Sequence, residues 1–158
     1  MDFEKRLEKA IDRGKRSRDE LSRKQNERTL SEEELKSQHS KCRIELSEHI
    51  DGCLKKLSEH FPGFDFETVV DEDGWGAVIS RDDFRSGRNE NHFSRLRMVI
   101  RPYSSANIVE LVARGTIRNK EALNRNHYQF LSQTDLNSFK DMIDLWVLEY
   151  AEKYSATK

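Results

Sequence analysis

The sequence is short of the features that stabilise secreted and membrane proteins. It has only two cysteines, Cys42 and Cys53, which lie roughly 16 Å apart along one predicted helix. This separation is too large for a mutual disulfide, so we expect free thiols and a reducing compartment. No stretch approaches the roughly 20 apolar residues of a membrane span, and the first residues show no apolar signal run. We therefore expect a cytoplasmic location and no membrane partner.

Hydrophobic residues are also scarce, at 35% of the 158 residues, while charged residues make up 36%. The apolar residues concentrate after Leu35 and are sparse before residue 30. A core needs buried apolar area, which the first part of the chain cannot supply alone. The sequence thus predicts a charged, weakly anchored helical extension over residues 1–30 and a single α+β domain over residues 31–158.

The extension carries a weak coiled-coil pattern with 4,3,4,3,4 spacing, formed by Phe3, Leu7, Ala10, Gly14, Ser17 and Leu21. Pairs of opposite charge four residues apart, such as Asp12 with Arg16, support a solvated helix equally well. The pattern leaves two interpretations open, a solvated helix or self-association through this seam.

A second helix is predicted to begin at Ser31, because Ser31 and Glu34 fit a capping box. It should run to about His60, since Pro62-Gly63 follows. A last helix is expected after Thr134 or Ser132 as N-cap. Its apolar residues recur at helical spacing and should cover a sheet: Leu136, Phe139, Ile143, Trp146, Tyr150 and Tyr154.

Between these helices the period changes to that of strands. Four strands are predicted, over residues 64–71, 75–80, 93–101 and 108–118, with a polar loop over residues 85–91. Residues 119–133 fit either a helical turn or a structured loop. Short connections favour an antiparallel meander. The predicted fold is therefore α+β, with a long N-terminal helical segment, a four-stranded antiparallel meander and a C-terminal helix packed on one sheet face.

Motifs of the common catalytic classes are missing. The chain has no Gly-x-Ser-x-Gly elbow and no glycine-rich phosphate loop. Asp82, Asp83, His92 and His127 lie in or near predicted loops, and Asp82 with Glu110 could be imagined as a carboxylate pair on strands. A hydrolase or nuclease built on Asp82, Asp83 and His127 remains an alternative, but a non-enzymatic protein is favoured. No catalytic residue and no cofactor is predicted.

One helix face gathers residues of the types that bind zinc: Cys42, His49, Cys53 and His60. The first and last are about 27 Å apart along the helix, so one ion cannot bind all four from one chain. Leu46 and Leu57 share this face, and a cysteine packs as a small hydrophobe. We interpret the face as core rather than as a metal site. A two-residue clamp that shares a metal with another chain is the alternative.

The clearest candidate site is an arginine-rich sheet face. Alternation along the third and fourth strands places Leu96, Met98 and Ile100 on one face and the arginines on the other. Residues 81–127 contain ten Lys or Arg and five Asp or Glu, although the formal net charge of the chain is −1. The predicted binding residues on or beside this face are Arg95, Arg97, Arg101, Arg114, Arg118, Lys120, Arg125 and His127.

These features predict a protein-interaction module that recognises an acidic partner. The partner could be another chain or the Glu32–Glu34 region of this one, because guanidinium groups pair well with carboxylates. Nucleic-acid binding through the same arginines, with Phe93 as a stacking ring, is the alternative. An ordinary solvated surface would show the same pattern.

Overall fold

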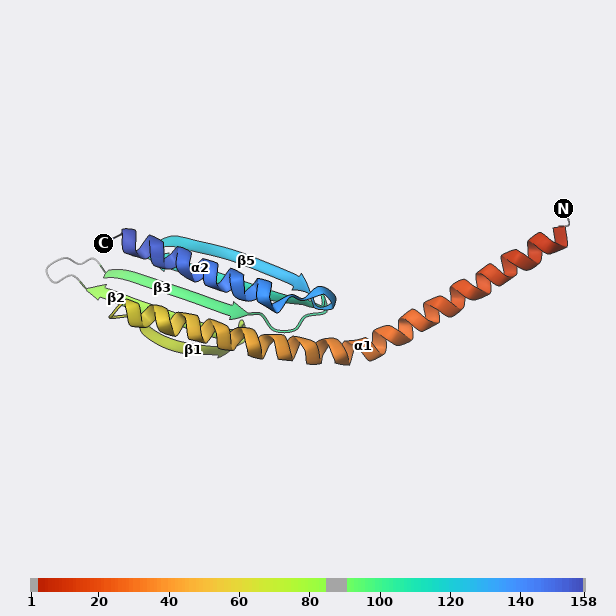
Figure 1. The fold of residues 1–158 in the computed structure, drawn as a ribbon, viewed down its shortest axis with the longest axis horizontal. Helices are drawn as coiled ribbons and strands as arrows, with labels where there is room; N and C mark the ends of the chain where they lie inside the picture. The colour runs from red at the N-terminus through yellow and green to blue at the C-terminus, as the bar shows by residue number, and fades with distance from the viewer. Residues whose placement is uncertain (1–2, 85–90, 158) are drawn as a thin grey trace. The chain divides into compact units, whose positions relative to one another are not determined.

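The computed structural model describes residues 3–84 and 91–157, apart from the side chains of residues 20–31, 84 and 91. The predicted loop over residues 85–91 therefore lies almost wholly outside the described residues. The chain divides into two compact units, Met1–Ser37 and Gln38–Lys158. The second unit contains the sheet, the C-terminal helix and the last part of the first helix (Figure 1).

A single helix, α1, spans Phe3–His60. The predicted break before Ser31 is wrong, because the backbone is helical through this residue and cannot adopt the extended N-cap conformation there. No proline or glycine lies between Gly14 and Gly52 to interrupt the helix. The predicted end is correct, since the helix stops at His60 and Gly63 follows with a φ of 103°.

The sheet is an antiparallel meander with strand order β1-β2-β3-β4-β5, so the predicted topology is confirmed. It has five strands rather than four. Their bounds are Asp65–Asp71 for β1, Gly74–Phe84 for β2, Asn91–Ile100 for β3, Ile108–Ile117 for β4 and Lys120–Phe130 for β5. The last strand occupies the segment for which the sequence favoured a helical turn or loop, and that interpretation is wrong.

The hairpin between β4 and β5 turns at Arg118 and Asn119. Both have positive φ, 47° and 70°, as a tight two-residue hairpin turn requires. The Asn119 backbone N–H donates to Phe93 O at 2.8 Å, and its side-chain oxygen accepts from Phe93 N at 2.9 Å. The turn is thereby attached to β3, the strand beside β4.

The helices cover one face of the sheet, where α2 (Leu136–Ala156) and residues 38–60 of α1 lie side by side (Figure 1). The covered face of β3 is fully buried at Leu96, Met98 and Ile100, as predicted. The predicted stripe of α2 is confirmed too, since Phe139, Ile143, Trp146, Tyr150 and Tyr154 are buried. The Tyr150 hydroxyl donates to Thr116 O at 2.9 Å, which joins α2 to β4.

The N-cap of α2 is Asp135 and not the predicted Thr134 or Ser132. The Asp135 carboxylate accepts from the backbone N–H groups of Asn137 and Ser138 at 3.1 and 3.3 Å. Thr134 instead donates its hydroxyl to Phe130 O at 3.0 Å. No helix in the described residues is long and apolar enough to cross a membrane.

Candidate functional site

The face of the sheet opposite the helices, called here the open face, carries a row of valines. Val69, Val78, Val99 and Val112 come from β1, β2, β3 and β4, respectively. The first three are 4–9% exposed although no helix covers them. Long polar side chains around the row must therefore shield it, and these include the predicted arginines.

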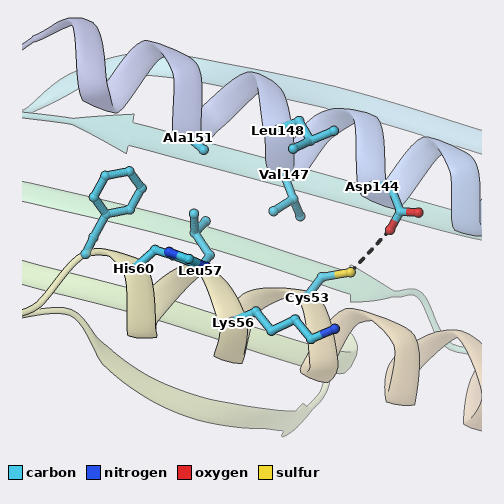
Figure 2. Close-up of a pocket in the computed structure, with 9 residues that line it drawn as sticks. Cys53, Lys56, Leu57, His60, Asp144, Val147, Leu148 and Ala151 are labelled. Atoms are coloured by element: carbon cyan, nitrogen blue, oxygen red, sulfur yellow. Dashed lines mark hydrogen bonds between the residues drawn. The ribbon is translucent and has the colours of Figure 1, made fainter.

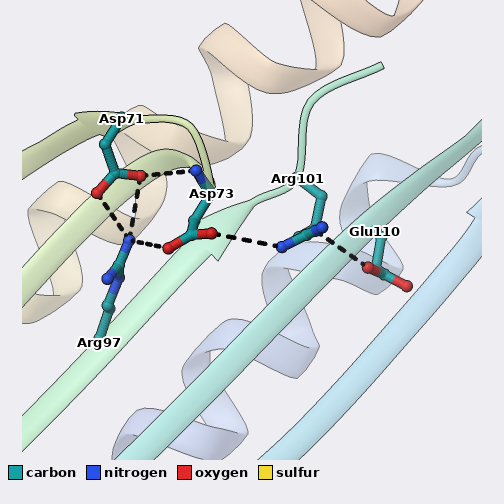
Figure 3. Close-up of polar contacts among 5 residues, drawn as sticks. All are labelled: Asp71, Asp73, Arg97, Arg101 and Glu110. Atoms are coloured by element: carbon teal, nitrogen blue, oxygen red, sulfur yellow. Dashed lines mark hydrogen bonds and ion pairs between the residues drawn. The ribbon is translucent and has the colours of Figure 1, made fainter. Parts of the chain in front are cut away.

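Two arginines of the open face, Arg97 and Arg101, are paired with carboxylates of the same unit (Figure 3). The Nη2 group of Arg97 donates to Asp71 Oδ2 at 2.9 Å and lies 3.4 Å from Asp73 Oδ2. The Arg101 guanidinium is held more loosely, 3.9 Å from Asp73 and 3.6 Å from Glu110. Charges thus alternate across the face in a network of three acids and two arginines.

This network corrects the charge balance expected from residues 81–127. Asp71, at the end of β1, and Asp73, in the turn before β2, lie outside that window, and the meander brings them near the end of β3. The open face is therefore a surface of mixed charge rather than a positive one. A shallow hollow of about 250 Å³ lies over it, lined by Asp73, Arg97, Val99, Arg101, Val112 and Arg114.

Two further arginines on the open face are not paired with carboxylates in the described part of the chain. Arg114 uses its Nη1 to donate to Ala113 O, Arg125 O and Asn126 Oδ1, at 2.9–3.1 Å, so it lies along β5. Arg95 is half-buried and forms no ion pair with a described residue. Among the described residues of the open face, these two guanidinium groups are available to an acidic ligand without displacing a carboxylate.

The other predicted binding residues do not join this face. Arg118 is in the β4–β5 turn and Lys120 begins β5, where it is exposed. Arg125 pairs with Glu149 of α2 at 2.8 Å, and the His127 ring packs edge-on against Phe139 of α2. Arg125 and His127 therefore belong to the helix-covered side. Their strand was not predicted, so its alternation could not be used to place them.

The structure adds two aromatic residues that the sequence reasoning missed. Tyr128 and Phe130 lie on the open face of β5, opposite Glu110 and Ile108. They are 55% and 53% exposed, and their rings meet edge to face with centroids 5.9 Å apart. The alternation of Tyr128 and Phe130 around Gln129 is typical of a strand and could have indicated their shared face. It lies at the end of a segment that was interpreted as a helical turn or loop.

A second feature lies between the two helices, where an apolar groove of about 610 Å³ opens (Figure 2). Its lining includes Leu57, Val147, Leu148 and Ala151, together with the more polar Lys56 and His60. Cys53 and Asp144 line the same groove. The predicted set of two cysteines and two histidines is thus divided, since Cys42 is buried in the core and His60 is exposed.

The remaining two members of that set converge on α2. His49 Nε2 lies 2.8 Å from Asp144 Oδ1, and the Cys53 thiol donates to the same oxygen at 3.3 Å. Burial, and then the neighbouring Asp144 carboxylate, raise the pKa of Cys53 to about 12. The thiol is therefore protonated and a poor nucleophile when no cation is bound.

The residues considered for hydrolysis are not assembled. Asp82 and Asp83 are consecutive on β2 and point to opposite faces. Asp83 accepts from Arg81 at 2.7 Å, and His127 is on β5, separated from β2 by two strands. The imagined pair is not formed either, because β3 lies between Asp82 on β2 and Glu110 on β4.

Comparisons with known proteins return no match, whether against protein-family models, curated proteins or solved structures.

Proposed function

We propose that the chain is a protein-interaction module whose open sheet face docks a protein partner with acidic side chains. The single observation behind this is the composition of that face. Two exposed aromatic rings, Tyr128 and Phe130, share the face with a row of valines, which polar side chains shield, and with paired charges. Protein interfaces share this organisation, an apolar centre enriched in aromatic residues and arginine within a polar rim.

The acidic character of the partner rests on Arg95 and Arg114, which have no carboxylate partner among the described residues. Arg101 is a third arginine that could bind an acidic side chain of the partner, because its contacts of 3.6 and 3.9 Å are long and its side chain is 47% exposed. Exposed ion pairs of this kind contribute about 0–1 kcal/mol, so an incoming carboxylate can replace Glu110 or Asp73 at small cost. We place this interaction in the cytoplasm, where Cys42 and Cys53 would remain as free thiols.

Binding of nucleic acid is the weaker alternative. Exposed Tyr128 and Phe130 beside arginines could stack on bases. However, Asp71, Asp73 and Glu110 share the surface with those arginines and would repel phosphates. The mixed charge therefore favours a protein ligand.

The test compares two pairs of exposed apolar residues on opposite sides of the sheet-containing unit. Tyr128→Ala with Phe130→Ala changes the open face, and Leu145→Ala with Leu148→Ala changes α2, where these leucines are 61% and 65% exposed. Partners captured from an extract of the native host are identified with the wild-type chain, and their Kd values are then measured for each variant.

The open-face pair should weaken binding by about 2 kcal/mol or more, as expected for central interface residues, and the α2 pair should leave it unchanged. Arg95→Glu should also weaken it, because like charges would then meet. Loss of binding only in the α2 pair would refute the proposal. Titration with single-stranded and duplex oligonucleotides at two salt concentrations covers the alternative, which predicts an affinity that falls steeply with salt.

A further inference from the structure

His49, Cys53 and Asp144 bring three metal-binding atoms together from two helices. His49 and Cys53 are four residues apart on α1, so they are neighbours on one helix face, and Asp144 faces them from α2. Their ligand atoms all lie within 4.8 Å of one another. Nitrogen, sulfur and oxygen ligands of this kind are the set that zinc accepts.

Two of the three separations between the ligand atoms are close to those around a tetrahedral ion. Ordinary zinc bond lengths place the ligand atoms of a tetrahedron roughly 3.4–3.6 Å apart. The observed separations from Asp144 Oδ1 are 2.8 Å to His49 Nε2 and 3.3 Å to Cys53 Sγ. An ion would take the place of the protons now shared with Oδ1, which would lengthen these two separations by several tenths of an ångström. His49 Nε2 and Cys53 Sγ, which lie within 4.8 Å of each other, would adjust to the same tetrahedron.

A simple ion pair between the helices explains these contacts less completely. Lys140 and Glu45 already form such a pair between α2 and α1, at 2.8 Å, and no third described residue joins it. At Asp144, a histidine and a thiol both approach one carboxylate oxygen. The site is also accessible, because the His49 and Asp144 side chains are 28% and 49% exposed.

We propose that His49, Cys53 and Asp144 form a binding site for a zinc-type divalent ion, which joins α1 to α2 at the wall of the helix groove. Three protein ligands leave a fourth position for water or for a donor atom of a molecule in the groove. Cys53 and Asp144 both line that groove, so a bound ion would be reached from it (Figure 2). The site is independent of the open face.

The test uses the full-length chain and Co²⁺ as a spectroscopic substitute for Zn²⁺. A thiolate ligand gives Co²⁺ a sulfur-to-metal charge-transfer band, and a tetrahedral site gives intense visible bands. We expect one equivalent of Co²⁺ to produce both and Zn²⁺ to displace it. Cys53→Ser should remove the charge-transfer band, and His49→Ala and Asp144→Asn should weaken Zn²⁺ binding.

Substitution of a residue that only hydrogen-bonds a metal ligand lowers metal affinity by about 10–100-fold, so loss of a direct ligand should lower it by at least that much. His60→Ala is the matched control, because His60 is an exposed histidine of the same groove that lies outside the cluster. Its affinity should equal that of the wild type. Asp144→Asn keeps the shape of an exposed side chain, so the test remains valid if His49→Ala fails to fold.

Two results would overturn the proposal. One is an absence of charge-transfer absorption at one equivalent of Co²⁺. The other is a Zn²⁺ affinity that is the same in the wild type, Cys53→Ser and Asp144→Asn, which would indicate an adventitious ion only. A melting temperature that rises with Zn²⁺ in the wild type and His60→Ala, but not in Asp144→Asn, would support the link between the helices.

Discussion

Glycines show at the residue scale how neighbouring atoms decide the effect of one methyl group. A Cβ at Gly115 of β4 would lie 2.9 Å from Leu123 Cβ and 3.0 Å from Tyr150 Cδ2. A Cβ at Gly52 of α1 would meet nothing within 4 Å. At the first position α2 packs closely against the sheet, and the second is an exposed helix surface.

The same substitution should therefore have opposite effects at these two positions. Gly115→Ala should lower the free energy of unfolding by about 1–3 kcal/mol through overpacking. Gly52→Ala should raise it by about 0.5–1 kcal/mol, because alanine is the better helix former. Urea denaturation of both variants measures this. Destabilisation by Gly52→Ala, or a neutral Gly115→Ala, would contradict the packing described between α2 and β4.

His39 is a second residue whose surroundings predict a measurable effect. It is 2% exposed, its Nε2 has no hydrogen-bond partner among the described residues, and its ring packs edge-on against Tyr103. Burial lowers the pKa of His39, aided by the nearby Arg43 guanidinium and opposed by a hydrogen bond with the Arg101 backbone. The folded chain thus holds this histidine neutral more strongly than the unfolded chain does.

We predict that stability falls as the pH decreases from 7 to 5. With a folded pKa below the unfolded value of about 6.5, the unfolded chain binds the proton more readily. The contribution of neutral His39 to the free energy of unfolding is complete above the unfolded pKa. It is lost as the pH falls below that pKa, with a slope of at most about 1.4 kcal/mol per pH unit. Denaturation at several pH values should show a smaller slope for His39→Phe. Burial raises the pKa of Asp51, which acts in the opposite sense, so the comparison of slopes isolates His39.

At the scale of elements, α1 contains leucines in two different settings. Leu46 is fully buried within residues 38–158, whereas Leu7 is 47% exposed and Phe3 is 75% exposed. The seam predicted over residues 3–21 is therefore solvent-exposed at Phe3 and Leu7, and Leu21 lies outside the described side chains. Such a stripe is stable in water only as part of a solvated helix or against another helix.

We propose that this seam self-associates, as a weak coiled coil. Leu46→Ala, the comparison variant, should lower the free energy of unfolding by about 2–5 kcal/mol, because Leu46 is fully buried in the sheet-containing unit. Leu7→Ala should change the melting of the sheet-containing unit very little and should instead lower the association constant. Light scattering across a concentration series measures association. A wild-type chain that stays monomeric at the highest concentration would remove the coiled coil and leave the solvated helix.

The elements that the sequence predicted best are those with strong apolar periodicity. The stripe of α2 and the alternation of Leu96, Met98 and Ile100 each determine one face, and the structure confirms both. β5 was missed because its outward positions include Asn124 and Asn126, which are uncommon in strands. The helical start at Ser31 was predicted from a local capping motif. In the structure the helix continues through Ser31, because the residues around it favour helix and include no proline or glycine.

The candidate sites were less predictable because they depend on contacts between distant residues. Asp144 meets His49 and Cys53 across more than 90 positions, and no local pattern connects them. Likewise, Asp71 and Asp73 reach Arg97 only through the pairing of β1, β2 and β3. The sequence could place the arginines on one face but could not supply the acids that neutralise two of them.

At the scale of the whole sheet-containing unit, one face is covered by helices and the other is open, so stability and binding should depend on alternate residues of one strand. β3 provides the comparison, since Arg95 and Arg97 face outward and Met98 is fully buried beneath the helices. Met98→Ala should cost about 2–5 kcal/mol of stability. Arg95→Glu should change stability by no more than about 0.5 kcal/mol and should weaken partner binding.

Arg97→Glu should differ from both of these variants. Arg97 is 22% exposed and bonded to Asp71 and Asp73, so a glutamate there would place a third carboxylate beside two others. We expect a loss of stability between those of Arg95→Glu and Met98→Ala, partly recovered at high salt because salt screens exposed charges. Denaturation of the three variants at two salt concentrations gives the order. If Arg95→Glu proves as costly as Met98→Ala, the open face is not open in solution, and the proposed docking surface is wrong.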